Sequence, residues 1–160
     1  MPDAAYPYAT HLNVLHAPLE VVDLQPLIDA CADRWYNQTL CRVNDSVVRL
    51  GVMQGEYHWH KHDEEDEFLY VISGEATVIE EDGAHLLQPG DAACWPAGTA
   101  NAHQVVNQSR APCSYLIFGT GAVPDIVHYP ERGEILYAFE DGSWRLQRTD
   151  GALIKEGNPD

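Results

Sequence analysis

The strongest constraint on the fold of this chain is a set of three histidines at alternate positions, His58, His60 and His62. Side chains two residues apart in a β-strand point to the same face, so these imidazoles would line one face of a strand. After four further residues, Glu67 opens an apolar, strand-like run over residues 68–72 that ends at Ser73-Gly74. We therefore expect the chain to turn after the histidines and to bring the Glu67 carboxylate back towards them.

A second segment, residues 90–107, offers a further imidazole, that of His103, on what should be another strand. Neutral imidazole together with carboxylate is a donor set that suits a divalent transition metal, here Fe, Mn, Ni, Co or Zn. The plainer alternative is that these are ordinary polar residues on a water-facing sheet, but it would have to explain two coincident patterns. A metal site is therefore the first function that the residues indicate.

The rest of the chain alternates short apolar or β-branched segments with turn residues, which predicts an all-β sandwich or small barrel. Further strands are expected over residues 39–43, 47–52, 76–79, 85–87, 92–95, 103–107, 114–118, 135–139, 144–147 and 153–155. Asp-Gly pairs supply the positive φ angles that tight hairpin turns need, and they occur at Asp82-Gly83, Asp141-Gly142 and Asp150-Gly151. A short helix is expected over residues 23–31, with Asp23 as its N-cap.

At 160 residues the chain has the size of one domain. We expect an N-terminal arm with the short helix over residues 1–36, a barrel core over about 37–120, and a C-terminal part over 121–160. Within the last part, residues 123–133 contain two prolines and are predicted to cross the domain before terminal hairpins.

The net charge of −16 argues against nucleic acid or an anionic membrane surface as a partner, because binding those needs clustered Lys and Arg. No apolar run approaches the length that spans a bilayer, and residues 1–10 have neither a basic start nor an apolar stretch. We therefore expect a soluble, cytoplasmic protein. The four cysteines are widely spaced and are expected to be reduced thiols rather than zinc ligands or disulfides.

Both segments resemble the two motifs of the cupin superfamily. The first motif is matched by residues 54–62, Glu67 and Gly74, and the second by Gly90, Pro96-Ala97-Gly98, His103 and Asn107. The resemblance covers about residues 46–120 and implies a double-stranded β-helix, a jelly-roll barrel with one metal at its mouth. It implies that the metal ligands are His60, His62, Glu67 and His103, and that the protein is a homodimer. Two departures are that Gly55 lies one residue closer to His60 than usual, and that four residues rather than two separate Gly98 from His103.

Other polar residues admit two interpretations. The alternation rule turns His58 towards the ligands, where it would be the available general base, whereas a bulge near Gly55 would rotate it into a supporting role. The acidic run over residues 63–66 is interpreted as solvated. Strand parity predicts that the pocket wall consists of Val52, Gln54, Leu69, Val71 and Val105. The aromatic residues predicted to lie in the core or wall are Trp59, Trp95, Tyr70 and Phe118.

Three imidazoles and one carboxylate would leave two adjacent positions of an octahedral metal for a chelating ligand, or for one substrate atom and dioxygen. The chain is accordingly predicted to be a metal-dependent enzyme, either a dioxygenase or an isomerase or lyase, that acts on a small chelating organic compound. The alternative is a non-catalytic cupin that binds or senses a small molecule, and a third possibility is a structural barrel with an empty site.

Overall fold

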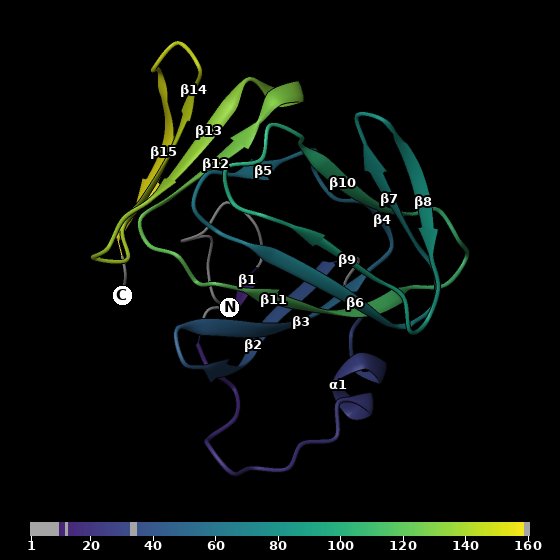
Figure 1. Ribbon diagram of the computed structural model, residues 1–160. Coiled ribbons are helices and arrows are strands. Elements are labelled where there is room, and N and C mark those ends of the chain that lie inside the picture. The colour runs from purple at the N-terminus through teal and green to yellow at the C-terminus, as the bar shows by residue number, and fades with distance from the viewer. Residues whose placement is uncertain (1–9, 12, 33–34, 159–160) are drawn as a thin grey trace.

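Strands arranged in three sheets make up most of the molecule (Figure 1). The computed structural model describes residues 10–11, 13–32 and 35–158. The helices within those ranges are α1 (Gln25–Asp29) and the 3-10 helix η1 (Pro130–Arg132). The predicted all-β class with a short N-terminal helix is thus confirmed. Helix α1 is shorter than expected and its N-cap position is Leu24, although the Asp23 carboxylate accepts a hydrogen bond from the backbone N–H of Gln25 at 3.0 Å.

The largest sheet has the strand order β1-β2-β3-β11-β6-β9. Its strands are β1 (Thr10–His11), β2 (Trp35–Val43), β3 (Ser46–Met53), β6 (Glu67–Ser73), β9 (Ala92–Trp95) and β11 (Cys113–Gly119). The predicted first hairpin is confirmed, because Val43 of β2 lies opposite Ser46 of β3. Asn44 in the turn between them has a φ of 54°, a conformation that asparagine tolerates better than most residues.

A second sheet has the order β4-β10-β7-β8. Its strands are β4 (Gly55–Glu56), β7 (Ala76–Glu80), β8 (Gly83–Leu87) and β10 (His103–Asn107). The hairpin of β7 and β8 is as predicted, but the expected positive φ angle at Gly83 in its turn is wrong. Gly83 pairs with Glu80 as a strand residue and is not among the glycines of positive φ, whereas Gly142 and Gly151 have φ values of 81° and 90°.

The main core lies between these two sheets, which together are called the roll below. Alternate residues of facing strands enter it, among them Leu69 and Val71 of β6, Val78 of β7 and Val105 of β10. Val52 lies instead in a separate cluster with Leu40, Val48 and Leu50, against which apolar residues in and beside α1 pack. Strand parity thus placed Val52 on the wrong face of β3, because the neighbouring residue Met53 is the one that enters the main core.

The third sheet has the order β15-β14-β13-β12-β5 and is called the C-terminal sheet. Its strands are β5 (Lys61–His62), β12 (Asp125–Tyr129), β13 (Glu134–Ala138), β14 (Trp144–Arg148) and β15 (Leu153–Gly157). It has a small core of its own, formed by Val127, Tyr129, Leu136, Trp144 and Leu146. Residues 123–133, expected to be a crossing segment, contain β12 and η1. Because β12 pairs with β5, with Val127 opposite His62, this sheet reaches the histidine segment.

In the part of the chain that the structure describes, no helix is both long enough and apolar enough to cross a membrane. The apolar side of α1 is occupied by the contacts described above, since Leu24, Leu27, Ile28 and Cys31 pack against the cluster around Leu50.

Candidate metal centre

Three chain segments, residues 60–62 and the first residues of β6 and β10, meet at one end of the roll and bring the predicted ligands together. His60 lies between β4 and β5, directly opposite His103 at the start of β10, and the two residues exchange backbone N–H to carbonyl hydrogen bonds of 2.9 Å each. His62 lies on β5 and Glu67 is the first residue of β6. The longer loop before His103 therefore does not displace it, and its side chain is buried, with 3% of the residue exposed.

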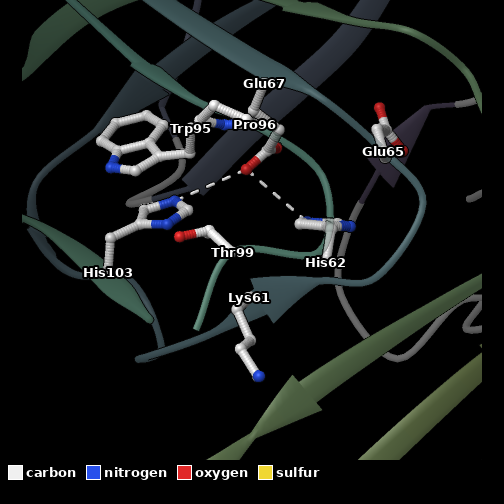
Figure 2. Close-up of a pocket in the computed structure, with 8 residues that line it drawn as sticks. All are labelled: Lys61, His62, Glu65, Glu67, Trp95, Pro96, Thr99 and His103. Carbon is white, nitrogen blue, oxygen red and sulfur yellow. Dashed lines mark ion pairs between the residues drawn. The ribbon is translucent and has the colours of Figure 1, made fainter. Parts of the chain in front are cut away.

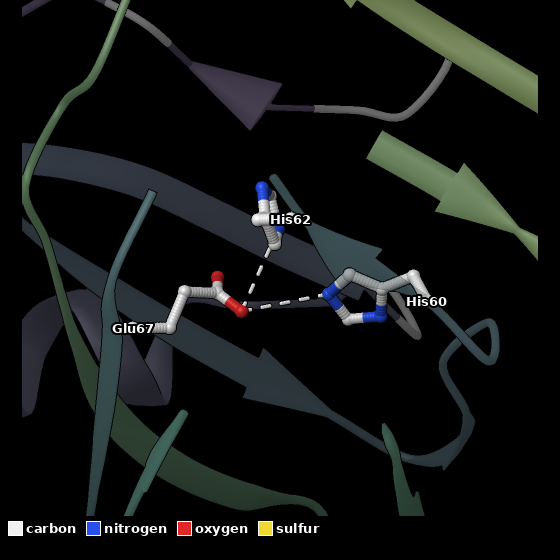
Figure 3. A group of neighbouring side chains, drawn as sticks. All are labelled: His60, His62 and Glu67. Carbon is white, nitrogen blue, oxygen red and sulfur yellow. Dashed lines mark ion pairs between the residues drawn. The ribbon is translucent and has the colours of Figure 1, made fainter. Parts of the chain in front are cut away.

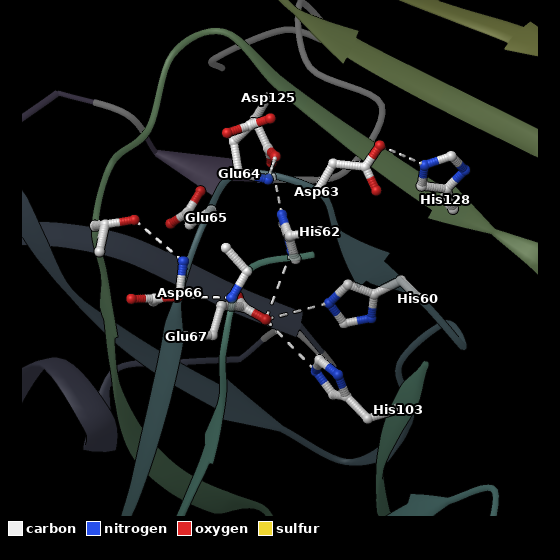
Figure 4. A network of polar contacts seen from close by, with 12 residues as sticks. His60, His62, Asp63, Glu64, Glu65, Asp66, Glu67, His103, Asp125 and His128 are labelled. Atoms are coloured by element: carbon white, nitrogen blue, oxygen red, sulfur yellow. Dashed lines mark hydrogen bonds and ion pairs between the residues drawn. The ribbon is translucent and has the colours of Figure 1, made fainter. Parts of the chain in front are cut away.

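Three imidazoles surround one carboxylate oxygen (Figure 4), and Figure 3 shows two of them, those of His60 and His62. The distances from Oε2 of Glu67 are 3.6 Å to Nε2 of His60, 3.5 Å to Nε2 of His62 and 3.5 Å to Nε2 of His103. One ligand atom from each of His60, His62 and Glu67 lies within 4.8 Å of the other two, close enough to hold a single ion. The fourth predicted residue, His103, reaches the same carboxylate oxygen but is not part of that group of mutually close ligand atoms.

Two of the imidazoles are oriented by hydrogen bonds at their second nitrogen. Nδ1 of His60 lies 2.9 Å from the carbonyl oxygen of His58, and Nδ1 of His62 lies 2.7 Å from Oδ2 of Asp125. Carbonyl and carboxylate oxygens accept hydrogen bonds, so in both residues Nδ1 carries a proton and its N–H donates the hydrogen bond. When these rings are neutral, the lone pair of Nε2 then faces Glu67, which is the orientation that a metal ligand requires.

The charges in this cluster stabilise one another. Burial opposes the charge of Glu67, but the surrounding imidazoles hold the pKa of its carboxyl well below its usual range. Burial likewise opposes a charged His62, but the Glu67 carboxylate and the hydrogen bond to Asp125 raise the pKa of that imidazole to about 9. In the metal-free protein His62 is therefore an imidazolium held between two carboxylates near neutral pH.

A small pocket opens beside this cluster (Figure 2). The space inside it that a water-sized group can occupy is about 10 Å³, roughly the room of one water molecule. It is lined by Lys61, His62, Glu65, Glu67, Trp95, Pro96, Thr99 and His103. The predicted wall is wrong, because none of its five members is in this lining, and Leu69, Val71 and Val105 instead fill the core between the sheets.

The ring of His58 points to other neighbours. Its Nε2 lies 3.3 Å from Nη1 of Arg132, and its ring centroid is 6.3 Å from that of Tyr129. Burial and the nearby Arg132 guanidinium lower the pKa of the His58 imidazole. His58 is not among the pocket-lining residues, and the atom that contacts a predicted ligand is its backbone carbonyl oxygen. A catalytic role for the His58 ring stays a prediction.

Two acidic residues at this site were missed by the sequence analysis. Asp125 is 3% exposed, and besides its contact with His62 it accepts a hydrogen bond from the backbone N–H of Glu64 at 3.0 Å. Glu65 was interpreted as solvated but is 9% exposed and lies 3.4 Å from Nη1 of Arg49. Burial raises the pKa of the Glu65 carboxyl. No local pattern marks either residue, because each is buried by a segment distant in sequence.

The aromatic residues divide into two groups. Trp95 is buried in the main core, as predicted. Tyr70 and Phe118 were predicted to be buried as well, but they are 39% and 38% exposed. Tyr70 alternates with the core residues Leu69 and Val71 along β6, so it lies on the outer face of the largest sheet.

The profile of the cupin domain family matches residues 47–119, a range that includes all four converging side chains. The chain is also 31% identical to the uncharacterized protein YdbB of Bacillus subtilis (strain 168) over 80 residues, which cover 49% of this chain and 71% of that protein. The chain belongs to the cupin superfamily. The fold is accordingly the double-stranded β-helix that the two motifs predicted.

Solved cupin structures extend the similarity beyond the matched motifs. A sugar phosphate isomerase from the cupin superfamily of Silicibacter pomeroyi DSS-3 aligns with a TM-score of 0.67 at 26% identity, covering 86% of this chain and 88% of its own. A proposed sugar phosphate isomerase of Acidithiobacillus ferrooxidans ATCC 23270 aligns with a TM-score of 0.62 at 25% identity, covering 76% and 80%. The Silicibacter structure covers more of this cupin than the family profile does. The structural similarity therefore extends beyond residues 47–119.

Proposed function

We propose that this cupin binds one divalent transition metal through His60, His62, Glu67 and His103, and that it is a metal-dependent isomerase acting on a small oxygen-rich compound. The observation that carries the proposal is the convergence of three imidazole Nε2 atoms on Oε2 of Glu67, at 3.5 to 3.6 Å. Three histidines and a glutamate without a common function would have little reason to be buried around one point, since burying ionisable groups is costly.

The residues fit a metal in three respects. The donor set of neutral imidazole and carboxylate suits Fe, Mn, Ni, Co or Zn. Hydrogen bonds from Nδ1 of His60 and His62 leave their Nε2 atoms available at the centre. The negative charge of Glu67, and of Asp125 behind His62, would offset the charge of a cation. When bound, such a cation supplies a Lewis acid that polarises a substrate oxygen.

The pocket supports a small, polar substrate. Beside the cluster, its lining includes the hydroxyl-bearing Thr99, which could bind hydroxyl groups, whereas the Lys61 side chain extends away from the cluster in Figure 2. Trp95 and Pro96 supply apolar surface on the same lining and would limit access of water. This combination favours a compact oxygenated compound over a large apolar one, and the overall similarity to a sugar phosphate isomerase favours isomerisation over oxygenation.

The test has two stages. The protein is first purified without added metal or chelator, and its metal content is measured; we expect one transition metal per chain, and its absence would contradict the proposal. The protein loaded with a single metal is then incubated with a panel of sugar phosphates, free sugars, hydroxy acids and catechols. NMR follows isomerisation while an electrode follows dissolved oxygen. Product formation without oxygen uptake is the expected result, and uptake that depends on the metal would identify a dioxygenase instead.

A non-catalytic binding or sensing function is the second candidate. The observation that favours it is that the ring of His58, the base predicted from the sequence, does not line the pocket. In the same panel, saturable binding of one compound without any product over long incubation would support this function over the isomerase.

A further inference from the structure

His103 differs from the other two histidines of the cluster at its second nitrogen. Nδ1 of His60 and Nδ1 of His62 each have an oxygen acceptor. Nδ1 of His103 is buried and, among the residues that the structure describes, has no hydrogen-bond partner. At that nitrogen no hydrogen bond orients the His103 ring, which leaves the Glu67 contact and the neighbouring rings.

The nearest of these rings is the indole of Trp95, which lies flat against the imidazole (Figure 2). The ring centroids of Trp95 and His103 are 3.8 Å apart and the planes differ by 5°. The indole is itself fixed, because its Nε1–H donates a hydrogen bond of 2.7 Å to Oε1 of Glu80. Glu80 ends β7 directly opposite His103 on β10, whereas Trp95 belongs to β9 of the other sheet. The stack thus ties the two sheets of the roll together at the ligand.

We propose that Trp95 is the positioning residue of His103 and that its stacked ring, anchored by Glu80, replaces the hydrogen bond that orients His60 and His62. The inference rests on the proposed function, since it concerns how a metal ligand is held. A flat ring at this distance blocks rotation of the imidazole out of its plane and keeps Nε2 directed at Oε2 of Glu67, 3.5 Å away. Removing a group that orients a ligand typically lowers metal affinity about 10- to 100-fold.

The test compares Co²⁺ binding by the wild type and a matched set of variants. Trp95→Leu removes the stacking face, and Trp95→Phe keeps an aromatic face but cannot donate to Glu80. Glu80→Ala removes the acceptor, and Glu80→Gln keeps an acceptor oxygen. Trp144→Phe is the control for the loss of a buried indole, because Trp144 is 4% exposed against 6% for Trp95 and belongs to the core of the C-terminal sheet.

We expect Trp95→Leu to weaken Co²⁺ binding by roughly 10- to 100-fold and to change the visible absorption bands of the bound ion, which report its ligand geometry. Trp95→Phe and Glu80→Ala should cause smaller losses, and Glu80→Gln should bind within about 3-fold of the wild type, because its amide oxygen can still accept from the indole. Trp144→Phe should keep both the affinity and the spectrum of the wild type even if its melting temperature falls.

Two negative outcomes are distinct. If Trp95→Leu binds Co²⁺ with the affinity and spectrum of the wild type, the positioning role is wrong and the metal site stands. The same holds if the Trp95 variants lose no more affinity than Trp144→Phe. If the wild type itself takes up no Co²⁺, the proposed function is wrong and the positioning role is wrong with it. If Trp95→Leu fails to fold, the comparison of Trp95→Phe and Glu80→Ala with Glu80→Gln decides the question.

Discussion

The roll and the C-terminal sheet contribute differently to the same site. The family profile, residues 47–119, includes every converging side chain. Strands β12 to β15 lie beyond that range, yet Asp125 of β12 contacts His62, and Tyr129 of β12 has its ring centroid 6.2 Å from that of His60. The candidate ligands all lie within residues 47–119, although His62 is on β5 of the C-terminal sheet, and β12 of that sheet supplies the Asp125 carboxylate that orients His62.

The motif residues alone do not account for how the candidate ligands are oriented. Within the roll, His103 is held by stacking on Trp95 and by backbone pairing with His60. His62 depends on a carboxylate that the chain reaches 63 residues later. The orientation of His62 therefore depends on a segment that lies outside the two motifs.

The largest effect on metal binding is expected from removing the imidazoles of His60 and His62. Structural metal sites bind with about 10–16 kcal/mol, so each of four ligands contributes on the order of 3 kcal/mol. His60→Ala and His62→Ala should each weaken metal binding roughly 100- to 1,000-fold while leaving a folded barrel, as measured by competition with a chelating dye and by circular dichroism. The control is His16→Ala, which removes an imidazole that pairs with Glu20 at 3.7 Å beside β2. Full metal retention by the double variant His60→Ala/His62→Ala would show that the ligand assignment is wrong.

A pH dependence of comparable size is expected in the metal-free protein. The pKa of His62 is raised to about 9 in the folded state, against 6.5 for an ordinary histidine. The resulting stabilisation is complete below pH 6.5 and is lost as the pH rises towards 9, and its size is on the order of 3 kcal/mol. Chemical denaturation at several pH values, compared with His62→Gln, should show this decline in the wild type alone. Parallel curves for the two proteins would contradict the charged His62.

The link between the two regions is tested by Asp125→Asn. The amide can still accept from Nδ1 of His62 but lacks the negative charge, so metal affinity should fall about 10-fold. Asp63→Asn is a matched control, because Asp63 pairs with His128 at 2.9 Å across the same two segments without contacting a candidate ligand. It should change metal affinity by less than about 3-fold. Equal losses in both variants would mean that general loosening of the C-terminal sheet, and not the His62 contact, is responsible.

The smallest effect on metal affinity is expected from His58→Gln. The ring of His58 faces Arg132, and the atom that contacts His60 is a backbone carbonyl oxygen that the substitution retains. Metal affinity should change by less than about 3-fold, because no hydrogen bond to a ligand is removed. Turnover of the substrate found in the panel tests the predicted base separately: a large loss of kcat with metal retained would support a catalytic role, and an unchanged kcat would exclude it.

Much of the fold and the convergence of the candidate ligands could be predicted from the sequence. Strand alternation and turn residues located β9 and β10 at their observed bounds, because both signals are local in the chain. The motif spacing identified His60, His62, Glu67 and His103, since the register of a roll places such positions at one end. The same local reasoning missed β12, whose two flanking prolines favoured a crossing segment.

Local patterns were thus enough to predict most strands of the roll and the set of side chains that converge. The folded chain was needed to show that Val52 packs in the cluster beside α1, that Glu65 is buried beside Arg49, and that Asp125 and Trp95 contact His62 and His103. Periodicity shows which residues share a face, whereas burial and hydrogen-bond partners depend on segments that meet only when the chain has folded.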